Sequence, residues 1–464
     1  MAVPATDPGP VPESPQVRAD YRPAGLPRTV ALSALALAVT VLVVEHLVRG
    51  NAYWDYSEGV YLFSSRLLLH GADLYGSVVA AQPPPLFAIG AGLLSIDDSL
   101  GWVRWAIGAV EVGAGLLAAQ VAWRLTASRA AASLAAPLTL LTPWIVHEHG
   151  SLIPEMFAAP LLLGGVLLAP QPRRAPWLGV LAALLAAFKL SYALPALVLI
   201  GVSSDWRRAT RWALAAAAVE IVLTFAVFGP AGVWRDTVVA QFESGHVGVR
   251  ALAGEWAQIA WNLSGLLVAA LVAWALRRHA RDVRTLRVAT AVAVATLLTL
   301  ASTWKLGTSL NSVIPAETVL VPLALAGCVW ALRESRRRVA GAVAVAAVVF
   351  AVAQGIALVA FPNVHGAHPF LRPGSSPGYG ITLYADEVDA AVRVARRCPR
   401  GVPYSGTPII AFIANRPLPG NQPDQYLSQL APVLKDARVA IRSVRTVCPS
   451  SPPATHGGGV VPRG

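Results

Sequence analysis

Residues 29–48, TVALSALALAVTVLVVEHLV, form one almost uninterrupted apolar stretch. A transmembrane helix needs roughly 20 such residues to cross the hydrocarbon core of a bilayer. Comparable stretches follow at residues 102–123, 130–146, 153–170, 211–229, 257–276, 288–304, 313–332 and 339–361. Between residues 176 and 203, two shorter apolar stretches on either side of Lys189 predict a tight pair of short helices. The pattern therefore predicts an all-α polytopic membrane protein with about eleven transmembrane helices.

The composition supports a membrane protein and argues against two other classes. Hydrophobic residues make up 55% of the 464 residues and charged residues only 13%, which is too apolar for a soluble protein of this length. The net charge of +12 comes from short basic clusters between apolar stretches. Membrane topology produces that spacing, so a nucleic-acid partner is excluded.

The loops between the apolar stretches sort by charge. Sixteen arginines lie in five short loops: Arg124 and Arg129; Arg173 and Arg174; Arg207, Arg208 and Arg211; Arg277, Arg278, Arg281, Arg284 and Arg287; and Arg333, Arg336, Arg337 and Arg338. The alternate loops carry acids instead, among them Asp55, Glu58, Asp73, Glu148 and Asp236. The positive-inside rule places the arginine loops and the N-terminus in the cytoplasm, and the acidic loops outside the cytoplasmic (inner) membrane.

Residues 49–101 are predicted to form one long outer loop with two helices at the membrane surface. The first, about residues 58–70, has apolar side chains on one side and Ser64, Ser65 and Arg66 towards the other, which is typical of an interfacial helix. The second begins at Pro83-Pro84-Pro85, since proline is tolerated in the first turn of a helix.

Four segments divide the chain. Residues 1–28, rich in Pro and Ala, are predicted to be a disordered cytoplasmic tail, and residues 29–361 a transmembrane domain. Residues 362–449 are predicted to be a small extracytoplasmic α/β domain with a helix at 385–397 and a strand near 402–413, followed by a disordered tail at 450–464. Cys398 and Cys448 both fall in this outer region, where a disulfide between them is compatible with the redox environment.

The residues that are able to perform chemistry gather in the outer loops. They are Asp55 and Glu58 in the first loop; His147, Glu148, His149 and Glu155 in the second; Lys189 in the short helix pair; and Lys305 and Asn311 farther along. Ionisable groups at one face of a helical bundle, beside interfacial helices, suit a site that takes a lipid-carried anionic substrate from the membrane. A carboxylate would serve as a general base there, and lysines would hold a phosphate.

Each of these residues also has a structural explanation. Asp55 has the position of an N-cap, with Glu58 three residues on, as in a capping box. His147 and His149 flank Glu148, but two histidines at this spacing chelate a metal poorly without further ligands, and a hydrogen-bonded loop explains them better. Lys305 has a stem long enough to reach the interface by snorkelling, whereas Lys189 between apolar stretches needs a partner.

The ordered set of motifs resembles that of the GT-C superfamily of polytopic glycosyltransferases. The resemblance is to its bacterial branch of polyprenyl-phosphate-sugar-dependent mannosyl- and arabinosyltransferases, and it covers roughly residues 29–361. The motifs are Asp55-Tyr56-Ser57-Glu58-Gly59, His70-Gly71-Ala72-Asp73-Leu74-Tyr75, Pro83-Pro84-Pro85-Leu86, Glu155, Phe188-Lys189, and Lys305-Leu306-Gly307 with Asn311.

The resemblance implies a set of roles. The acid of the first outer loop would be the catalytic base, with Glu58 first and Asp55 second or as its orienting partner. Lys189 and Lys305 would bind the donor phosphate, and Asn311, Glu155, His147 and His149 would complete the substrate site. Such enzymes dispense with a metal when the donor is a lipid phosphate, and Glu148 or His149 are the candidate ligands should Mg²⁺ or Mn²⁺ bind.

The sequence thus predicts an inverting membrane glycosyltransferase with a polyprenyl-phosphate sugar as donor and a glycan or lipid as acceptor. A hexose and a pentose are equally compatible. The alternative is a transporter or flippase for a lipid-linked substrate, without catalysis. Transporters commonly show paired halves and polar residues near the bilayer midplane, whereas the polar residues of this chain concentrate at one face.

Overall fold

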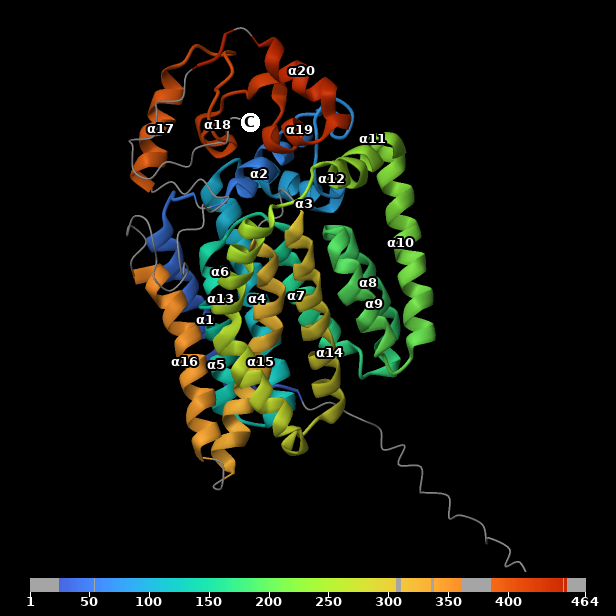
Figure 1. The fold of residues 1–464 in the computed structure, drawn as a ribbon, viewed down its shortest axis with the longest axis vertical. Coiled ribbons are helices and arrows are strands. Elements are labelled where there is room, and N and C mark those ends of the chain that lie inside the picture. The colour runs from blue at the N-terminus through green and yellow to red at the C-terminus, as the bar shows by residue number, and fades with distance from the viewer. Residues whose placement is uncertain are drawn as a thin grey trace, which may run out of the picture.

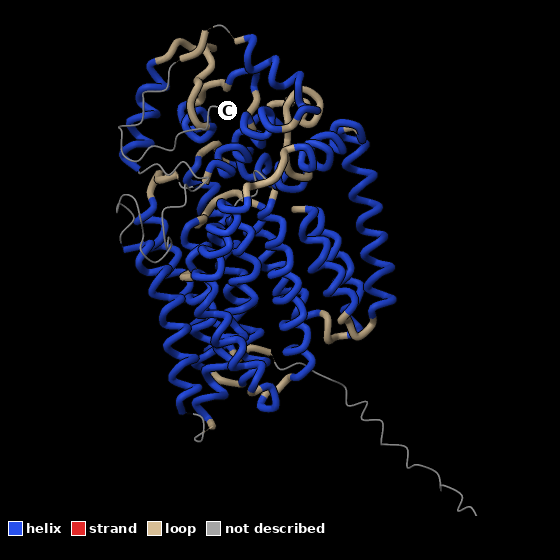
Figure 2. The backbone as a smooth tube through the Cα atoms, viewed as in Figure 1, coloured by secondary structure: helices blue, strands red, loops and turns tan. Residues whose placement is uncertain are grey.

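The computed structural model describes residues 25–53, 55–305, 310–334, 338–360, 385–444 and 446–448, and 80% of them lie in helices. Within these ranges the only β structure is three isolated bridges. Figure 2 shows that the bundle of long helices and most of the C-terminal region are helical. The predicted all-α membrane fold is therefore confirmed. The predicted tails at 1–28 and 450–464 lie outside the described residues, except for residues 25–28.

The chain begins with the long helix α1 (Arg28–Arg49). It continues with α2 (Tyr56–Leu69), α3 (Pro84–Ile96), α4 (Leu100–Thr126), α5 (Arg129–Leu140), α6 (Pro143–His147), α7 (Pro154–Leu168), α8 (Ala175–Phe188), α9 (Ala193–Gly201) and α10 (Trp206–Phe228). Next come α11 (Pro230–Trp234), α12 (Ala240–Glu243), α13 (Val249–Ala275), α14 (Val283–Thr299), α15 (Ile314–Arg333) and α16 (Arg338–Ala360). The C-terminal helices are α17 (Ala385–Arg397), α18 (Pro408–Ala414), α19 (Gln425–Leu430) and α20 (Lys435–Ser443).

Seven helices among the described residues are long and apolar enough to cross a membrane. They are Arg28–Arg49, Leu100–Thr126, Trp206–Phe228, Leu252–Ala275, Val283–Trp304, Asn311–Arg333 and Arg338–Ala357. The stretches at 130–146, 153–170 and 176–203 form the shorter helices α5 to α9, so the predicted count of eleven crossings is not confirmed. The cause is local: α5 ends at Leu140, just before Pro143 starts α6, and extended backbone at Lys189 separates α8 from α9.

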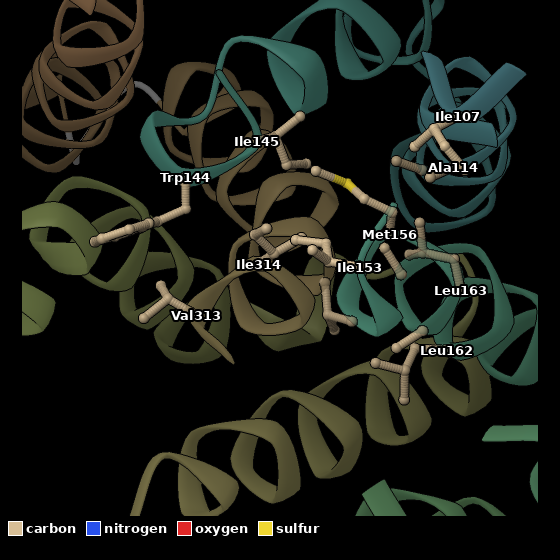
Figure 3. Close-up of a cluster of buried hydrophobic side chains, with 14 of the residues drawn as sticks. Ile107, Ala114, Trp144, Ile145, Ile153, Met156, Leu162, Leu163, Val313 and Ile314 are labelled. Atoms are coloured by element: carbon tan, nitrogen blue, oxygen red, sulfur yellow. The ribbon is translucent and has the colours of Figure 1, made fainter. Parts of the chain in front are cut away.

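Helix α15 lies at the centre of the bundle. In the most hydrophobic part of this helix, 94% of the residues are buried. The helix packs against α4, α5, α7, α13, α14 and α16. Figure 3 shows the core that surrounds its beginning, where Ile314 lies near Met156 of α7 and Ile145 of α6. The end of the bundle at which α15 begins is therefore closely packed, and this end carries the candidate site.

Helices α2 and α3 lie between this end of the bundle and the C-terminal helices α17 to α20, which we call the cap (Figure 1). The sequence predicted a helix with one polar face at 58–70, but Ser64 and Ser65 of α2 are fully buried. The reason is that α3 packs on α2 from one side and α18 of the cap from another. The predicted start of the second surface helix is confirmed, because α3 begins at Pro84 with Pro83 as its N-cap.

Gly59 and Arg66 explain how α18 docks on α2. A Cβ atom at Gly59 would lie only 2.6 Å from the backbone nitrogen of Ile409, so only glycine allows this approach. About two turns later, the Arg66 guanidinium donates to the Phe412 carbonyl at 2.6 Å and lies 3.6 Å above the Phe412 ring. The same side chain pairs with Asp98 at 2.7 Å.

The cap is helical where it is described. The predicted helix at 385–397 is confirmed as α17, but the predicted strand near 402–413 is wrong, because Pro408 starts the helix α18 inside it. An α/β cap is therefore not supported, and one bridge between Tyr404 and Cys448 is all the β structure in its described part. Cys398 and Cys448 form a disulfide with a Cα–Cα distance of 6.0 Å, as the sequence suggested.

Candidate active site

Asp55 is the N-cap of α2 at the junction of the bundle and the cap. Its Oδ1 accepts a hydrogen bond from the Ser57 backbone at 2.6 Å, so the capping role suggested by the sequence is confirmed. Its other oxygen, Oδ2, accepts from Asn311 Nδ2 at 3.3 Å, and the side chain is 7% exposed. Two of the predicted site residues, Asp55 and Asn311, therefore meet although 256 positions separate them.

Glu58 has a different environment from Asp55. It is fully buried, and both of its oxygens are bound by Arg104, which donates from Nε to Oε1 and from Nη2 to Oε2, each at 2.8 Å. Arg49 Nη2 approaches Oε2 at 3.4 Å. Two guanidinium groups occupy the lone pairs of this carboxylate, which leaves it poorly placed to receive a hydrogen bond from a substrate. This geometry favours a structural role for Glu58.

Glu148 lies beside Asp55 in the loop after α6. Its Oε1 is 2.8 Å from His147 Nδ1. The Glu148 side chain is fully buried, whereas that of His147 is 23% exposed. Burial raises the pKa of the Glu148 carboxyl well above its usual value, and the neighbouring Asp55 carboxyl raises it further. His147, Glu148, Asp55 and Asn311 thus form one continuous polar cluster.

Lys189 forms the second part of the site. Its ammonium group donates to Glu155 Oε1 at 2.6 Å and to Ser312 Oγ at 3.2 Å. Glu155 is 1% exposed and stands in the first turn of α7, while Lys189 follows the last residue of α8. The partner that the sequence required for this lysine is therefore Glu155. Ser312 is the residue after Asn311, so the two parts of the site are adjacent.

Lys305 forms the third part of the site. Its ammonium group donates to Gln241 Oε1. Burial lowers the pKa of the Lys305 ammonium group to about 8; the positive charge of Lys189 also lowers it, while Asp424 of the cap opposes the shift. Lys189 and Lys305 are therefore close enough to interact, and together they make this region attractive to an anion.

A cavity of about 70 Å³ lies between α2, the bundle and the cap. Its polar lining comes from Tyr56, Tyr61, Gln82, Gln241, Lys305, Asp424 and Tyr426. This volume holds only a few water molecules, at roughly 10–15 Å³ each. A sugar ring therefore needs more room than this cavity offers.

Tyr61 and Asp424 connect the cavity with the rest of the site. Burial raises the pKa of the Tyr61 hydroxyl well above its usual value, and the carboxyl groups of Glu155, Asp424 and Asp55 raise it further. The pKa of Asp424 is raised to about 6, chiefly by burial. The cavity is consequently flanked by acids from three separate parts of the fold and by the lysine Lys305.

Several residues of this region were not predicted from the sequence. Arg104 lies within the apolar stretch of α4, Arg49 ends α1, and Gln241 and Asp424 come from segments to which no role was assigned. For Arg104 a signal was present, since a charged residue inside a transmembrane stretch is costly and marks a specific partner. Nothing in the local sequence of Gln241 or Asp424 distinguishes them from ordinary loop residues.

His149 does not join the predicted substrate site. Its ring lies between Glu111 of α4 and Glu45 of α1, with Nδ1 at 2.8 Å from Glu111 Oε2 and at 3.3 Å from Glu45 Oε2. Among the described residues, these three are the group with the arrangement to hold a metal ion. Glu45 and Glu111 lie in the apolar stretches 29–48 and 102–123, which the sequence predicts to be transmembrane helices without a further role.

Comparisons with known proteins support the fold. No family model matches the chain, and no curated protein matches it. Among solved structures, the crystal structure of ArnT from Cupriavidus metallidurans bound to undecaprenyl phosphate is similar, with a TM-score of 0.58 and 16% sequence identity over 89% of each chain. The chain therefore shares the overall polytopic helical fold of this membrane protein.

Proposed function

We propose that the chain is an inverting membrane glycosyltransferase that moves a sugar from a polyprenyl-phosphate donor to a glycan or lipid acceptor. The observation that carries this proposal is the combination of Asp55 with two lysines, Lys189 and Lys305, at one end of the bundle. ArnT, whose fold is similar, was crystallised with undecaprenyl phosphate, which supports a lipid phosphate as part of the donor.

In this proposal Asp55 is the general base. Its carboxylate accepts the proton of the acceptor hydroxyl while that oxygen attacks the anomeric carbon from the face opposite the leaving group. The bond between the anomeric carbon and the phosphate oxygen breaks, and polyprenyl phosphate leaves with the electron pair. Asn311 holds Asp55 Oδ2 from the side and fixes the direction of the carboxylate.

The two lysines would stabilise the leaving group. Negative charge grows on the phosphate as the bond to the sugar breaks, and ammonium groups placed beforehand near it lower the barrier. Lys189 is oriented by Glu155, and Lys305 by Gln241 at the edge of the cavity. The aromatic rings of Tyr56 and Tyr426 that line this cavity offer surfaces against which a sugar ring can pack.

Glu58 has a supporting role in the proposal, although its sequence pattern made it the first candidate for the base. Its carboxylate is bound by Arg104 and Arg49 in the interior, whereas Asp55 lies next to the cavity-lining residues Tyr56 and Ser57. We therefore assign the base to Asp55. The arginine-rich loops support an active site on the outer face of the cytoplasmic membrane, with the cap on the same side.

The test uses the purified full-length chain in lipid nanodiscs with a panel of polyprenyl-phosphate sugars, among them mannosyl and arabinosyl donors. We expect one donor to be consumed, with release of polyprenyl phosphate. Asp55→Asn should lower the rate by roughly 10²–10⁴-fold, the usual contribution of a general base. Asparagine is as good an N-cap as aspartate, so this variant removes the base but keeps the start of α2.

The matched control is Asp97→Asn, which changes an exposed acid at the end of α3 and should leave turnover unchanged. Full activity of Asp55→Asn would refute the assignment of the base. Movement of an intact lipid-linked sugar across a liposome membrane, without consumption of any donor, would show that the chain is a flippase and not a transferase.

A further inference from the structure

Glu45, Glu111 and His149 form a buried cluster close to Arg49. They are 3%, 2% and 1% exposed, respectively, and come from α1, α4 and the loop that follows α6. One donor atom of each lies within 4.8 Å of the others. None of the three has a part in the glycosyl transfer proposed above.

The hydrogen bonds of this cluster are incomplete. Neither oxygen of Glu45 receives a hydrogen bond from the described part of the chain, and His149 Nε2 has no partner there either. Glu111, in contrast, accepts from the Gly150 backbone at 2.7 Å and faces His149 Nδ1. A carboxylate buried without hydrogen bonds is strongly disfavoured, so Glu45 either carries a proton or needs a cation beside it.

The charges of the surroundings point in the same direction. Glu58 already shares the two nearest guanidinium groups, those of Arg49 and Arg104. With His149 neutral and every carboxyl group ionised, Glu45, Glu111 and Glu58 exceed these two cations by one negative charge, and Glu148 beside Arg49 adds a further one. A bound cation between Glu45 and Glu111 would remove this excess.

We propose that Glu45, Glu111 and His149 bind a divalent metal ion, and that the ion is of the Zn²⁺ class. One imidazole and two carboxylates are a common ligand set for Zn²⁺, with bonds of about 2.0–2.2 Å. Two ligands of a tetrahedral ion at that distance lie about 3.4 Å apart. The separations of Nδ1 from the two carboxylate oxygens are 2.8 and 3.3 Å, so one would have to widen by about 0.6 Å and the other by about 0.1 Å.

The metal would have a structural role. It would join α1, α4 and the loop of residues 148–151. Arg49 of α1 already contacts this loop, because its side chain donates to the His149 carbonyl and, at 3.1 Å, to Ser151 Oγ. The loop carries Glu148, the neighbour of Asp55. The ion would therefore hold the second loop of the candidate site against the bundle, whatever reaction that site performs.

The direct test is the metal content of the full-length chain, purified without a polyhistidine tag and analysed by inductively coupled plasma mass spectrometry. We expect about one equivalent of zinc after incubation with Zn²⁺ and desalting, and a loss of at least tenfold in His149→Ala and Glu111→Gln. The matched controls are His279→Ala, in a loop at the other end of the bundle, and Glu220→Gln in α10, and both should retain the metal.

A second measurement guards against variants that fold poorly. Zn²⁺ should raise the unfolding temperature of the wild type and of His149→Cys, because a thiolate is a zinc ligand, but not that of His149→Ala. A chain that folds, binds no divalent ion and shows no shift with Zn²⁺, Mn²⁺ or Mg²⁺ would overturn the proposal. A protonated His149 would then be the cation between the two carboxylates.

Discussion

Replacement of Glu58 by glutamine separates a structural carboxylate from a catalytic one. In the structure, Glu58 is the shared acceptor of two buried guanidinium groups, those of Arg104 and Arg49. A glutamine keeps the shape of the side chain but has one acceptor atom in place of two. Its amide nitrogen would face a guanidinium donor, and the charge of the pair would be lost.

The expected magnitude follows from this burial. Arg104 is 1% exposed and Glu58 fully buried, so water does not replace the lost partner. Breaking a buried ion pair from one side destabilises a protein by about 3–5 kcal/mol. Arg104 keeps its bonds to the carbonyls of Gly50 and Ala52, at 2.8 and 2.9 Å, and these limit the loss. We therefore expect the lower end of this range.

The assay is thermal unfolding in detergent, followed by intrinsic fluorescence, for which the 14 tryptophans of the chain provide the signal. Glu58→Gln should unfold at a clearly lower temperature than the wild type, whereas Asp55→Asn should unfold near the wild-type temperature. The double variant Glu58→Gln with Arg104→Gln should recover part of the loss, because it leaves fewer buried charges unpaired. Transfer by the folded fraction of Glu58→Gln should remain above that of Asp55→Asn.

The opposite pattern would refute this reasoning. If Glu58→Gln unfolds at the wild-type temperature and its turnover falls as far as that of Asp55→Asn, then Glu58 takes part in the chemistry. The base would return to the residue that the sequence pattern favoured first.

Two further predictions concern the lysines. The pKa of Lys305 is lowered to about 8, so its ammonium group is charged below this pH and loses its proton above it. The kcat/KM for the donor should therefore fall about tenfold per pH unit above pH 8, which is the limiting slope for one proton. Lys305→Arg should flatten this profile, because arginine keeps its charge. A Lys305→Arg profile that falls as steeply as that of the wild type would contradict the role of this charge. Lys189→Met should lower the unfolding temperature, because it leaves the buried Glu155 carboxylate without its cation. The double variant Lys189→Met with Glu155→Gln should recover the stability but not the turnover of the donor. Recovery of turnover in that double variant would show that Lys189 is needed only as the partner of Glu155.

Much of the local structure was predictable because it depends on neighbouring residues. The apolar stretch at 29–48 predicts α1, the triple proline predicts the start of α3, and Asp55 before a helical run predicts an N-cap. The cysteines of the C-terminal region suggested the disulfide that joins Cys398 and Cys448. Errors arose where helices are interrupted, since the apolar stretches at 130–146 and 153–170 continue past the ends of short helices.

The faces of α2 show a second limit of the sequence. Ser64, Ser65 and Arg66 form a polar side that predicts contact with water. The structure covers this side with α3, where Gly90 lies against Ser65, and with α18, whose Phe412 contacts Arg66 from 346 residues away in the chain. The close approach at Gly59 and the contact of Arg66 with Phe412 allow this packing, and neither is visible from the residues of α2 alone.

The outer-loop acids Asp55 and Glu58 could be named as candidates from the sequence, together with Lys189, Lys305 and Asn311. Their different environments could not be assigned, because two carboxylates three residues apart have the same intrinsic chemistry. Only the tertiary structure brings Arg49 and Arg104 to Glu58, Asn311 to Asp55, and Glu45 and Glu111 to His149. The physical reason is that protonation and reactivity depend on burial and on charges within a few ångströms, and distant segments of the chain supply both.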